Sequence, residues 1–298
     1  MELNYSNQNV QEISFPSSKF LDTANRVKMS EPVGIFMFLE AADSIDIGDG
    51  YPVIAMEAQQ LTIQTATYQT SSEIQLDTIK DLEKIHGFDT ISFNTGILVD
   101  DARDKMEQNL FNKYSALGKE SYYSDFSKWQ RFLNKYFKIE FPIYSESDQI
   151  GAKILEISLK IAKKTRRGPA NFVVVSPQVL SIITDSPMFE FYAKEDVYSA
   201  LKVDCVGRIN HIQVFVNHLA LSHDVIVGMN TIDNNPGVLY GEYSRQLLQN
   251  ENRKTNTVRL ELRDRCVIQE KGNSAKNAYY TIPVEFHKKS IWRKLFKA

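Results

Sequence analysis

The sequence contains only two cysteines, Cys205 and Cys266, among its 298 residues. Two cysteines are too few for a disulfide framework, and neither has the closely spaced Cys and His partners that a structural zinc site needs. We therefore expect two buried thiols in a reducing compartment. Long apolar runs are also missing, since no window approaches the roughly 18 consecutive apolar residues of a membrane-spanning helix. The polar N-terminus, MELNYSNQNVQEISF, lacks the apolar core of a secretory signal.

Neither sign of charge is in clear excess. The 35 Lys and Arg residues nearly balance the 37 Asp and Glu residues, which gives a formal net charge of −2 and a pI of about 6.2. A dedicated nucleic-acid binder normally carries a basic stripe that neutralises phosphates, so this balance argues against one without excluding a protein that lies next to DNA. With 43% hydrophobic residues, the chain can form one large or two modest folded domains.

Motifs for catalysis are absent as well: the sequence has no P-loop, no G-x-G-x-x-G and no G-x-S-x-G. Three histidines are spaced seven and five residues apart, which does not match a helical metal-binding pair; these are His211, His218 and His223. His86, beside a glycine at a helix end, fits a role in complementing the helix dipole. An acidic cluster lacks the glycine-turned loop of a calcium site and predicts a solvated helix face (Asp100, Asp101, Asp104). We expect no catalytic, cofactor-binding or metal-ligating residues.

The most informative segment is Thr70–Gly118, which predicts two long amphipathic helices joined at an Ile-His-Gly bend. Thr70 and Glu73 form a capping-box pattern for the first helix, and Gly87 is suited to end it. The second helix carries a narrow apolar stripe (Leu98, Ala102, Met106, Leu110, Tyr114, Leu117). Its opposite face is charged and is expected to lie in water (Asp100, Asp101, Arg103, Asp104, Lys105, Glu107).

A long two-stranded finger precedes these helices. Val33–Leu39 predicts one strand, Ala41–Gly50 an acidic loop tip, and Tyr51–Tyr68 a second strand that runs into the first helix. A lone hairpin is only marginally stable in water, so we expect the finger to lie on this subunit or on another. Residues 1 to about 30 are polar and read as an extended arm whose placement depends on a partner.

The remainder predicts a mixed α and β region. An amphipathic helix over Ser147–Lys164 ends in the basic run Lys163–Arg167, whose cations complement the helix C-terminus or bind phosphate. Several strands follow, with a polar connection over Gln246–Thr257. The strands are expected at Asn171–Val175, Ile212–Val216, Val225–Val227, Gly237–Tyr243, Val258–Ile268 and Ala278–Phe286. The aromatic segment Tyr122–Tyr144 and the basic tail His287–Ala298 have no clear role, although the tail could dock on a partner or a membrane surface.

Four motifs in order carry a resemblance to a known family. Gln75–Phe111 resembles the spine-helix region of major capsid proteins from contractile-tailed bacteriophages, with Ile85-His86-Gly87 and Gly96-Ile97-Leu98 at the matching positions. Arg167–Val179, Asn235–Tyr243 and Lys276–Phe286 are similar to three later motifs of that family. The extended loop lacks the lysine through which some relatives cross-link, so that chemistry is not expected here.

The resemblance implies an α+β tailed-phage capsid fold. It implies an N-terminal arm over 1–32, an extended loop over 33–67, a peripheral domain with the spine helix over 68–145 and 246–298, and an axial domain over 146–245. It also implies a non-enzymatic subunit that assembles with itself as hexamers and pentamers in a virion capsid, formed in the host bacterial cytoplasm. Implied partners are a scaffolding protein, portal, decoration or vertex proteins, and packaged double-stranded DNA by proximity, with no membrane and no cofactor.

Three alternatives stay open on the sequence alone. The chain could form only the pentameric vertices, or it could be the shell protein of a cellular nanocompartment with the same fold. It could also be a soluble α/β enzyme with a site near His211, His218 and His223.

Overall fold

The computed structural model describes residues 8–13, 18–41, 45–47, 51–53, 56–121, 146–165, 167–192, 203–220, 223–230, 237–252 and 254–284. The chain divides into two compact units: Met1–Tyr114 with Asn230–Ala275, and Ser115–Met229 with Lys276–Ala298. The predicted features over residues 122–144 and 287–298 lie outside the described residues. None of the described helices combines the length and the apolar character that crossing a membrane requires.

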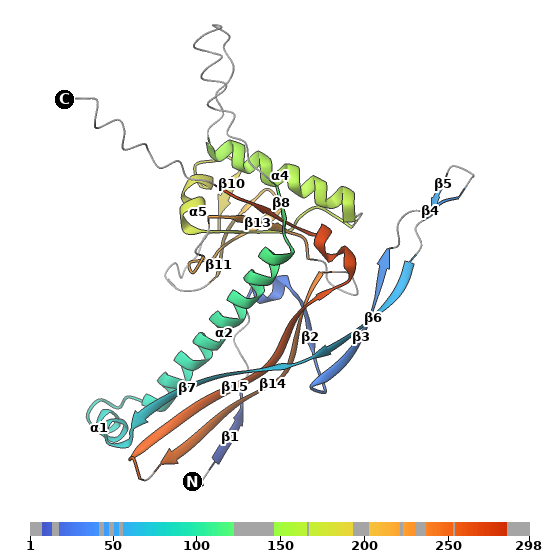
Figure 1. The fold of residues 1–298 in the computed structure, drawn as a ribbon. Coiled ribbons are helices and arrows are strands. Elements are labelled where there is room, and N and C mark those ends of the chain that lie inside the picture. Colours follow the sequence, from blue (N-terminus) through green and yellow to red (C-terminus); the bar gives the residue numbers. More distant parts are fainter. Residues whose placement is uncertain are drawn as a thin grey trace, which may run out of the picture. The chain divides into compact units, whose positions relative to one another are not determined.

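A five-stranded sheet forms the centre of the first unit (Figure 1). Its strands follow the order β1 (Gln8–Glu12), β14 (Gly237–Asn252), β15 (Thr257–Lys271) and β7 (Ala66–Gln75), and β2 (Asn25–Lys28) pairs with β14 in parallel. Alternate residues of β15 enter the core, as the sequence pattern predicted, because successive side chains of a strand point to opposite faces. The buried members are Val258, Leu260 and Leu262.

The predicted polar connection over Gln246–Thr257 is wrong. β14 continues to Asn252 and pairs with β15 along its whole length, so the polar residues belong to a strand. Leu247 and Leu248 are both buried, which shows that cross-strand pairing and packing outweigh the low β-propensity of the surrounding Gln and Asn residues.

Two helices join this sheet, α1 (Leu76–His86) and α2 (Thr90–Leu117), and the bend between them falls at Gly87 as predicted. The whole predicted apolar stripe of α2 is buried, with exposures of 6% or less (Leu98, Ala102, Met106, Leu110, Tyr114, Leu117). The prediction for the opposite face was wrong in part, because Arg103 and Glu107 are only 8% and 2% exposed.

The predicted capping box at Thr70 and Glu73 is also wrong. Both residues lie in β7, which pairs with β15 as far as Gln75, and the helix begins only at Leu76. Gln75 makes no side-chain cap bond; instead the Leu76 amide donates to the Asn256 carbonyl at 2.8 Å. The ladder with β15 therefore decides where strand becomes helix.

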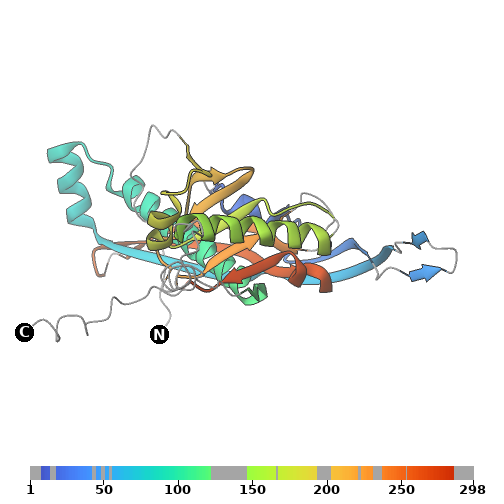
Figure 2. The same ribbon diagram turned by 90° about the horizontal axis from the view of Figure 1, so that it is seen from above.

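The predicted finger is confirmed. β3 (Val33–Ala41) pairs antiparallel with β6 (Met56–Gln64) over nine residue pairs. Part of the predicted loop tip is a strand as well, because β4 (Ile45–Ile47) pairs with β5 (Tyr51–Val53). Within the first unit, the finger and the α1 end of the sheet lie at opposite ends (Figure 2).

The second unit is a seven-stranded sheet packed against α4 (Glu146–Thr165) and α5 (Pro177–Ile183). The predicted stripe of α4 is confirmed, since Ile150, Ile154, Ile157 and Ile161 are fully buried in this core. The final predicted strand is shorter than expected and spans only Tyr279–Ile282. The strands in sheet order are β10 (Phe189–Phe191), β11 (Asp204–Ile209), β12 (Ile212–Val216), β9 (Phe172–Val175), β13 (Val225–Gly228), β16 (Tyr279–Ile282) and β8 (Lys119–Glu120).

Candidate assembly surfaces

The base of the finger is fixed to its own subunit. Ile63 on β6 is fully buried with Met29 and Leu239, and Phe36 and Leu61 pack against this cluster. A Cβ atom at Gly241 would lie 2.8 Å from the Met29 sulfur and 2.9 Å from Cγ1 of Val267. Position 241 therefore has little room for a side chain between Met29 and Val267, whereas Ile63 of the finger lies at an ordinary contact distance of 3.5 Å.

The opposite face of the finger is apolar and uncovered. Val33, Ile35 and Met37 alternate along β3, so they share one face, and they are 48%, 65% and 68% exposed. Their partners across the ribbon are Gln64, Thr62 and Gln60, which carry no charge. An uncharged ribbon with a row of exposed aliphatic side chains has the composition of a protein interface.

A second exposed apolar patch surrounds the bend between α1 and α2. Gly87 adopts φ +60°, the left-handed conformation that glycine tolerates best, and its amide donates to the Glu83 carbonyl at 2.9 Å. Asp89 begins α2 by accepting from the Ser92 amide at 3.0 Å, and this hydrogen bond lowers the pKa of Asp89.

This bend, which we call the elbow patch, exposes four apolar side chains: Ile85, Phe88, Phe93 and Ile97, at 71%, 40%, 55% and 50%. The rings of Phe88 and Phe93 lie 5.2 Å apart and form a small aromatic cluster in water. Four large apolar side chains gathered at one exposed bend indicate another contact surface.

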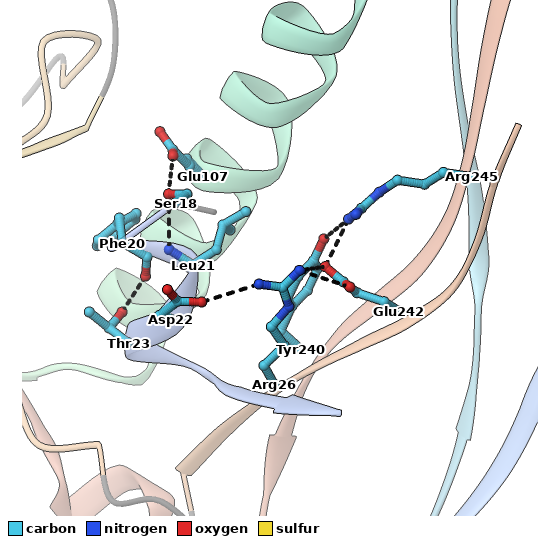
Figure 3. Close-up of polar contacts among 10 residues, drawn as sticks. All are labelled: Ser18, Phe20, Leu21, Asp22, Thr23, Arg26, Glu107, Tyr240, Glu242 and Arg245. Carbon is cyan, nitrogen blue, oxygen red and sulfur yellow. Dashed lines mark hydrogen bonds and ion pairs between the residues drawn. The ribbon is translucent and has the colours of Figure 1, made fainter. Parts of the chain in front are cut away.

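The described residues of the N-terminal arm are anchored on their own subunit, since Gln8–Glu12 and Asn25–Lys28 pair with β14 and the residues between contact α2 and the sheet (Figure 3). For these residues, the expectation that placement depends on a partner is corrected. Phe20 is fully buried and meets the Tyr114 ring of α2 edge-on, with the ring centres 6.2 Å apart. The Ser18 hydroxyl donates to the Glu107 carboxylate at 2.5 Å, and the hydroxyls of Thr23 and Tyr114 lie 3.1 Å apart. These contacts explain why Glu107 is buried instead of solvated.

Arg26 continues the anchor on the sheet (Figure 3). Its guanidinium donates to Glu242 at 3.0 Å and to Asp22 at 3.3 Å. Burial alone would raise the pKa of Glu242, but the nearby Arg245 and Arg26 outweigh burial and hold that pKa below its ordinary value. Glu242 is therefore a carboxylate shared between the arm and the sheet.

Arg245 neutralises a second buried carboxylate. Its Nε atom lies 3.2 Å from Asp264, while Nη2 donates to the Tyr240 hydroxyl at 2.7 Å. Burial raises the pKa of Asp264, and Arg245 opposes that change. Burying one charged group without its partner is costly, so Arg245 and Asp264 favour the strand pairing that keeps them together.

The C-terminal end of α4 is basic. Lys160, Lys163 and Lys164 are exposed, and the ammonium groups of Lys160 and Lys164 lie 5.0 and 5.8 Å from the Tyr280 ring centre. These distances are in the range of cation–π attraction, so the ring helps to hold both lysines in place. The predicted position of the basic run at a helix C-terminus is confirmed.

The other residues considered from sequence do not assemble into a reaction centre among the described residues, where no group of three His, Cys, Asp or Glu could hold a metal ion. His211 lies in the turn between β11 and β12, and His86 ends α1. Cys205 and Cys266 are buried free thiols, as predicted. All three members of the acidic cluster on α2 form ion pairs on their own helix: Asp100 with Arg103 at 3.1 Å, Asp101 with Lys105 at 2.7 Å and Asp104 with Arg103 at 4.0 Å.

A family model shows the family of this chain, and solved structures show its fold. The family model described as major capsid protein Gp23 matches residues 4–244. A solved chain from Microbacterium phage Oxtober96 aligns with a TM-score of 0.57 at 12% identity and covers 96% of this chain and 95% of that one. A chain from Mycobacterium phage Bobi gives 0.55 at 11% identity, with 96% of each chain covered. A chain from Mycobacterium phage Che8 gives 0.54 at 9% identity, with 95% and 94% covered. No curated protein matches the sequence.

Proposed function

Because the chain belongs to the major capsid protein Gp23 family, we propose that it closes a phage head as rings of five and six copies, each finger lying on the next copy. The chain is a shell-forming structural subunit of the tailed-phage capsid fold. The ring sizes and the place of the finger are the proposed part. Contacts of this kind are heterologous, and they form a closed ring when the rotation between copies completes a circle.

The observation that carries the proposal is the uncovered face of Val33, Ile35 and Met37 on a finger whose base is fixed. Removing the exposed part of each side chain from water is worth about 1 kcal/mol per residue. Contacts made by these three residues alone would hold two copies together weakly. In a ring, however, each copy makes two such contacts, one through its own finger and one with the finger of the preceding copy. Together with the elbow patch, the contacts could reach the roughly 2,000 Å² of an obligate interface.

Several finer features belong to the same proposal. A peripheral domain over 68–145 and 246–298 and an axial domain over 146–245 remain proposals, and their boundaries differ from those of the two compact units, which divide the chain after residues 114, 229 and 275. A scaffolding protein, a portal and decoration or vertex proteins would contact the shell, and double-stranded DNA would fill it without sequence-specific binding. Assembly would take place in the host bacterial cytoplasm, and the subunit would carry out no catalysis.

The test is the double substitution Ile35→Ser and Met37→Ser, made in the full chain. The subunit should stay folded, because both side chains face water, yet particles should be lost or need at least about tenfold higher subunit concentration. Phe191→Ser is the matched control, since it removes a 65% exposed apolar side chain from the second unit. Normal particles from the double variant, seen by negative-stain electron microscopy, would show that the finger face is not an assembly contact.

Three measurements separate the proposal from its rivals. The copy number per particle distinguishes a major subunit from one restricted to pentameric vertices. Analysis of the contents of purified particles distinguishes a phage head, which would enclose DNA, from a nanocompartment, which would enclose an enzyme. Metal analysis and substrate screening of the unassembled chain test the soluble-enzyme alternative.

A further inference from the structure

The five-stranded sheet of the first unit has two open edges. Its order runs from β1 through β14 and β15 to β7, and β2 pairs with β14 on the same side as β1. Among the described residues, no strand pairs with the outer side of β1 or with the outer side of β7. An open edge presents a row of unpaired amide and carbonyl groups, and another strand can bind to that row.

Neither edge carries the features that usually keep an edge strand from pairing. β7 is ten residues long, contains no Lys and no Pro, and has Glu73 as its only charged residue. It pairs with β15 without a bulge. β1 also lacks Lys and Pro, and its Val10 is 55% exposed. Because natural edge strands are commonly blocked by lysine, proline or a bulge, both edges are suited to being covered.

The hydrogen bonds at the end of β7 show which of its residues are available at the open edge. The Leu76 amide donates to the carbonyl of Asn256, the residue that lies opposite it in the ladder. Residues of a strand direct their backbone groups alternately to the two sides, so the even-numbered residues of β7 face β15. The odd-numbered residues Gln69, Ser71 and Glu73 therefore direct theirs to the open edge.

The same reasoning applies to β1. The Ile13 amide donates at 3.4 Å to the carbonyl of Arg245, which lies opposite it, so odd-numbered residues face β14. The even-numbered residues Gln8, Val10 and Glu12 therefore direct their backbone groups to the other open edge.

The outward-facing residues of the two edges lie level with each other. Val10 lies opposite Leu248, Leu248 lies opposite Glu261, and Glu261 lies opposite Ser71. The four strands alternate in direction across the sheet, so a further copy of β1 placed beside β7 would continue the antiparallel order. In that position, outward-facing residues would meet outward-facing residues, as an antiparallel ladder requires.

We propose that β1 of one copy of this chain pairs with β7 of the next copy, so that the sheets of neighbouring copies join edge to edge. This assignment rests on the proposed shell and adds a backbone contact that sets the register between copies. Val10 would exchange hydrogen bonds with Ser71, and Glu12 with Gln69. Glu12 and Glu73 would not lie directly opposite each other, so the register avoids a pair of like charges.

The base of the finger lies at the same edge of the sheet as β1. Ile63 packs with Leu239, and Leu239 pairs with Asn25 of β2, which shares the β1 side of β14. One copy therefore offers both its finger and its β1 edge on one side and its β7 edge on the other. A head-to-tail contact brings the finger and β1 to the same neighbour, as a ring of copies requires.

Pairing between the β7 edges of two copies is the competing arrangement. Such a contact is isologous, so it closes as a dimer and leaves no edge from which a ring of five or six could grow. The β1 edge is the better match because it gives a heterologous contact, which can close into a ring.

The experiment is disulfide cross-linking in assembled particles of the full chain that carries Val10→Cys and Ser71→Cys. Within one copy these positions are three strand spacings apart, about 14 Å, which is beyond the roughly 7 Å that a disulfide can span. Every such disulfide must therefore join two copies. The native thiols, Cys205 and Cys266, are buried. Oxidised particles should give a ladder of bands from dimers to pentamers and hexamers on a denaturing gel without reductant.

The matched control combines Val10→Cys with Thr67→Cys. Thr67 is exposed and directs its backbone groups outward like Ser71, but it lies four residues away along β7, about 13 Å. This pair should give less than about one-tenth of the cross-linked product, because the separation exceeds what a disulfide spans. Val10→Cys alone and Ser71→Cys alone should give no cross-linked ladder.

A proline substitution tests the same contact without cross-linking. Ser71→Pro removes an outward-facing amide, which edge strands tolerate, and should raise the subunit concentration needed for assembly by at least about tenfold. Thr67→Pro is the control, because its amide also faces outward but lies outside the segment Gln69–Glu73. Circular dichroism and thermal unfolding of the unassembled variants check that both are folded.

Four results would overturn the assignment. They are particles of the double-cysteine variant without cross-links, equal cross-linking through Thr67, dimers from Ser71→Cys alone, and normal assembly of a folded Ser71→Pro variant. The proposed shell would survive each of them as long as the unaltered chain forms particles. Failure of the unaltered chain to form particles would reject the shell and the edge pairing together.

Discussion

Replacing Phe20 with alanine tests whether the N-terminal arm is part of the folded subunit before assembly. Phe20 is fully buried and meets Tyr114 edge-on. Truncating a buried Phe to Ala typically costs about 3–5 kcal/mol, because the lost burial and the remaining cavity both count. For a subunit of ordinary stability, about 5–15 kcal/mol, this loss is a large fraction of the total.

The assay is urea unfolding of the unassembled subunit, with the free energy of unfolding compared between variants. Phe93→Ala is the control: that side chain is 55% exposed, so its truncation should cost less than about 1 kcal/mol. Equal, small losses from both substitutions would refute the reasoning. They would mean that the arm leaves its own subunit when no neighbour is present.

Three further predictions concern Gly241, Glu242 and the two buried thiols, one in each unit. Gly241→Ala should destabilise the unassembled subunit by about 1–3 kcal/mol in urea unfolding, because the added Cβ would lie 2.8 Å from the Met29 sulfur. The pKa of Glu242 is lowered in the folded subunit, so the ionised carboxylate stabilises the fold at neutral pH, and this contribution is lost as the pH falls below 4.5, the ordinary pKa of a glutamate. Glu242→Gln should therefore make the free energy of unfolding depend less steeply on pH in the acid range. An unchanged slope would contradict this prediction. Cys205 and Cys266 should fail to react with a thiol reagent in the native subunit and react fully in denaturant, and rapid native labelling would disprove their burial.

The sequence predicted the helices and the finger well because their patterns are local. The stripe of α2 from Leu98 to Leu117 and the stripe of α4 both follow helical spacing, and both are buried. Gly87 marks the bend because a left-handed residue after a helix favours glycine whatever lies around it. Such signals do not depend on the rest of the fold.

The errors arose where distant residues decide the structure. Thr70 and Glu73 form a capping pattern, yet they lie in a strand because β15, nearly 200 residues later, pairs with them. Glu107 looked solvent-facing on the helix, but Ser18 of the arm covers it. The same applies to Leu247 and Leu248, whose polar neighbours concealed a long strand. Contacts across large sequence separations leave no periodic trace in either segment.

The candidate surfaces were only partly predictable. The finger was expected from its alternating strands, but which face would be covered by its own subunit depended on the packing of Ile63 with Met29 and Leu239. The elbow patch was not predicted, because large apolar side chains such as Phe88, Phe93 and Ile97 are ordinarily expected in the core.

Cryo-electron microscopy of particles formed by this chain, alone or with its phage neighbours, measures the central claim most directly. The account predicts rings of five and six copies in which Val33, Ile35 and Met37 are covered by the adjoining copy. Particles that leave this face in contact with solvent, or a chain that stays monomeric at high concentration with every expected partner present, would contradict it.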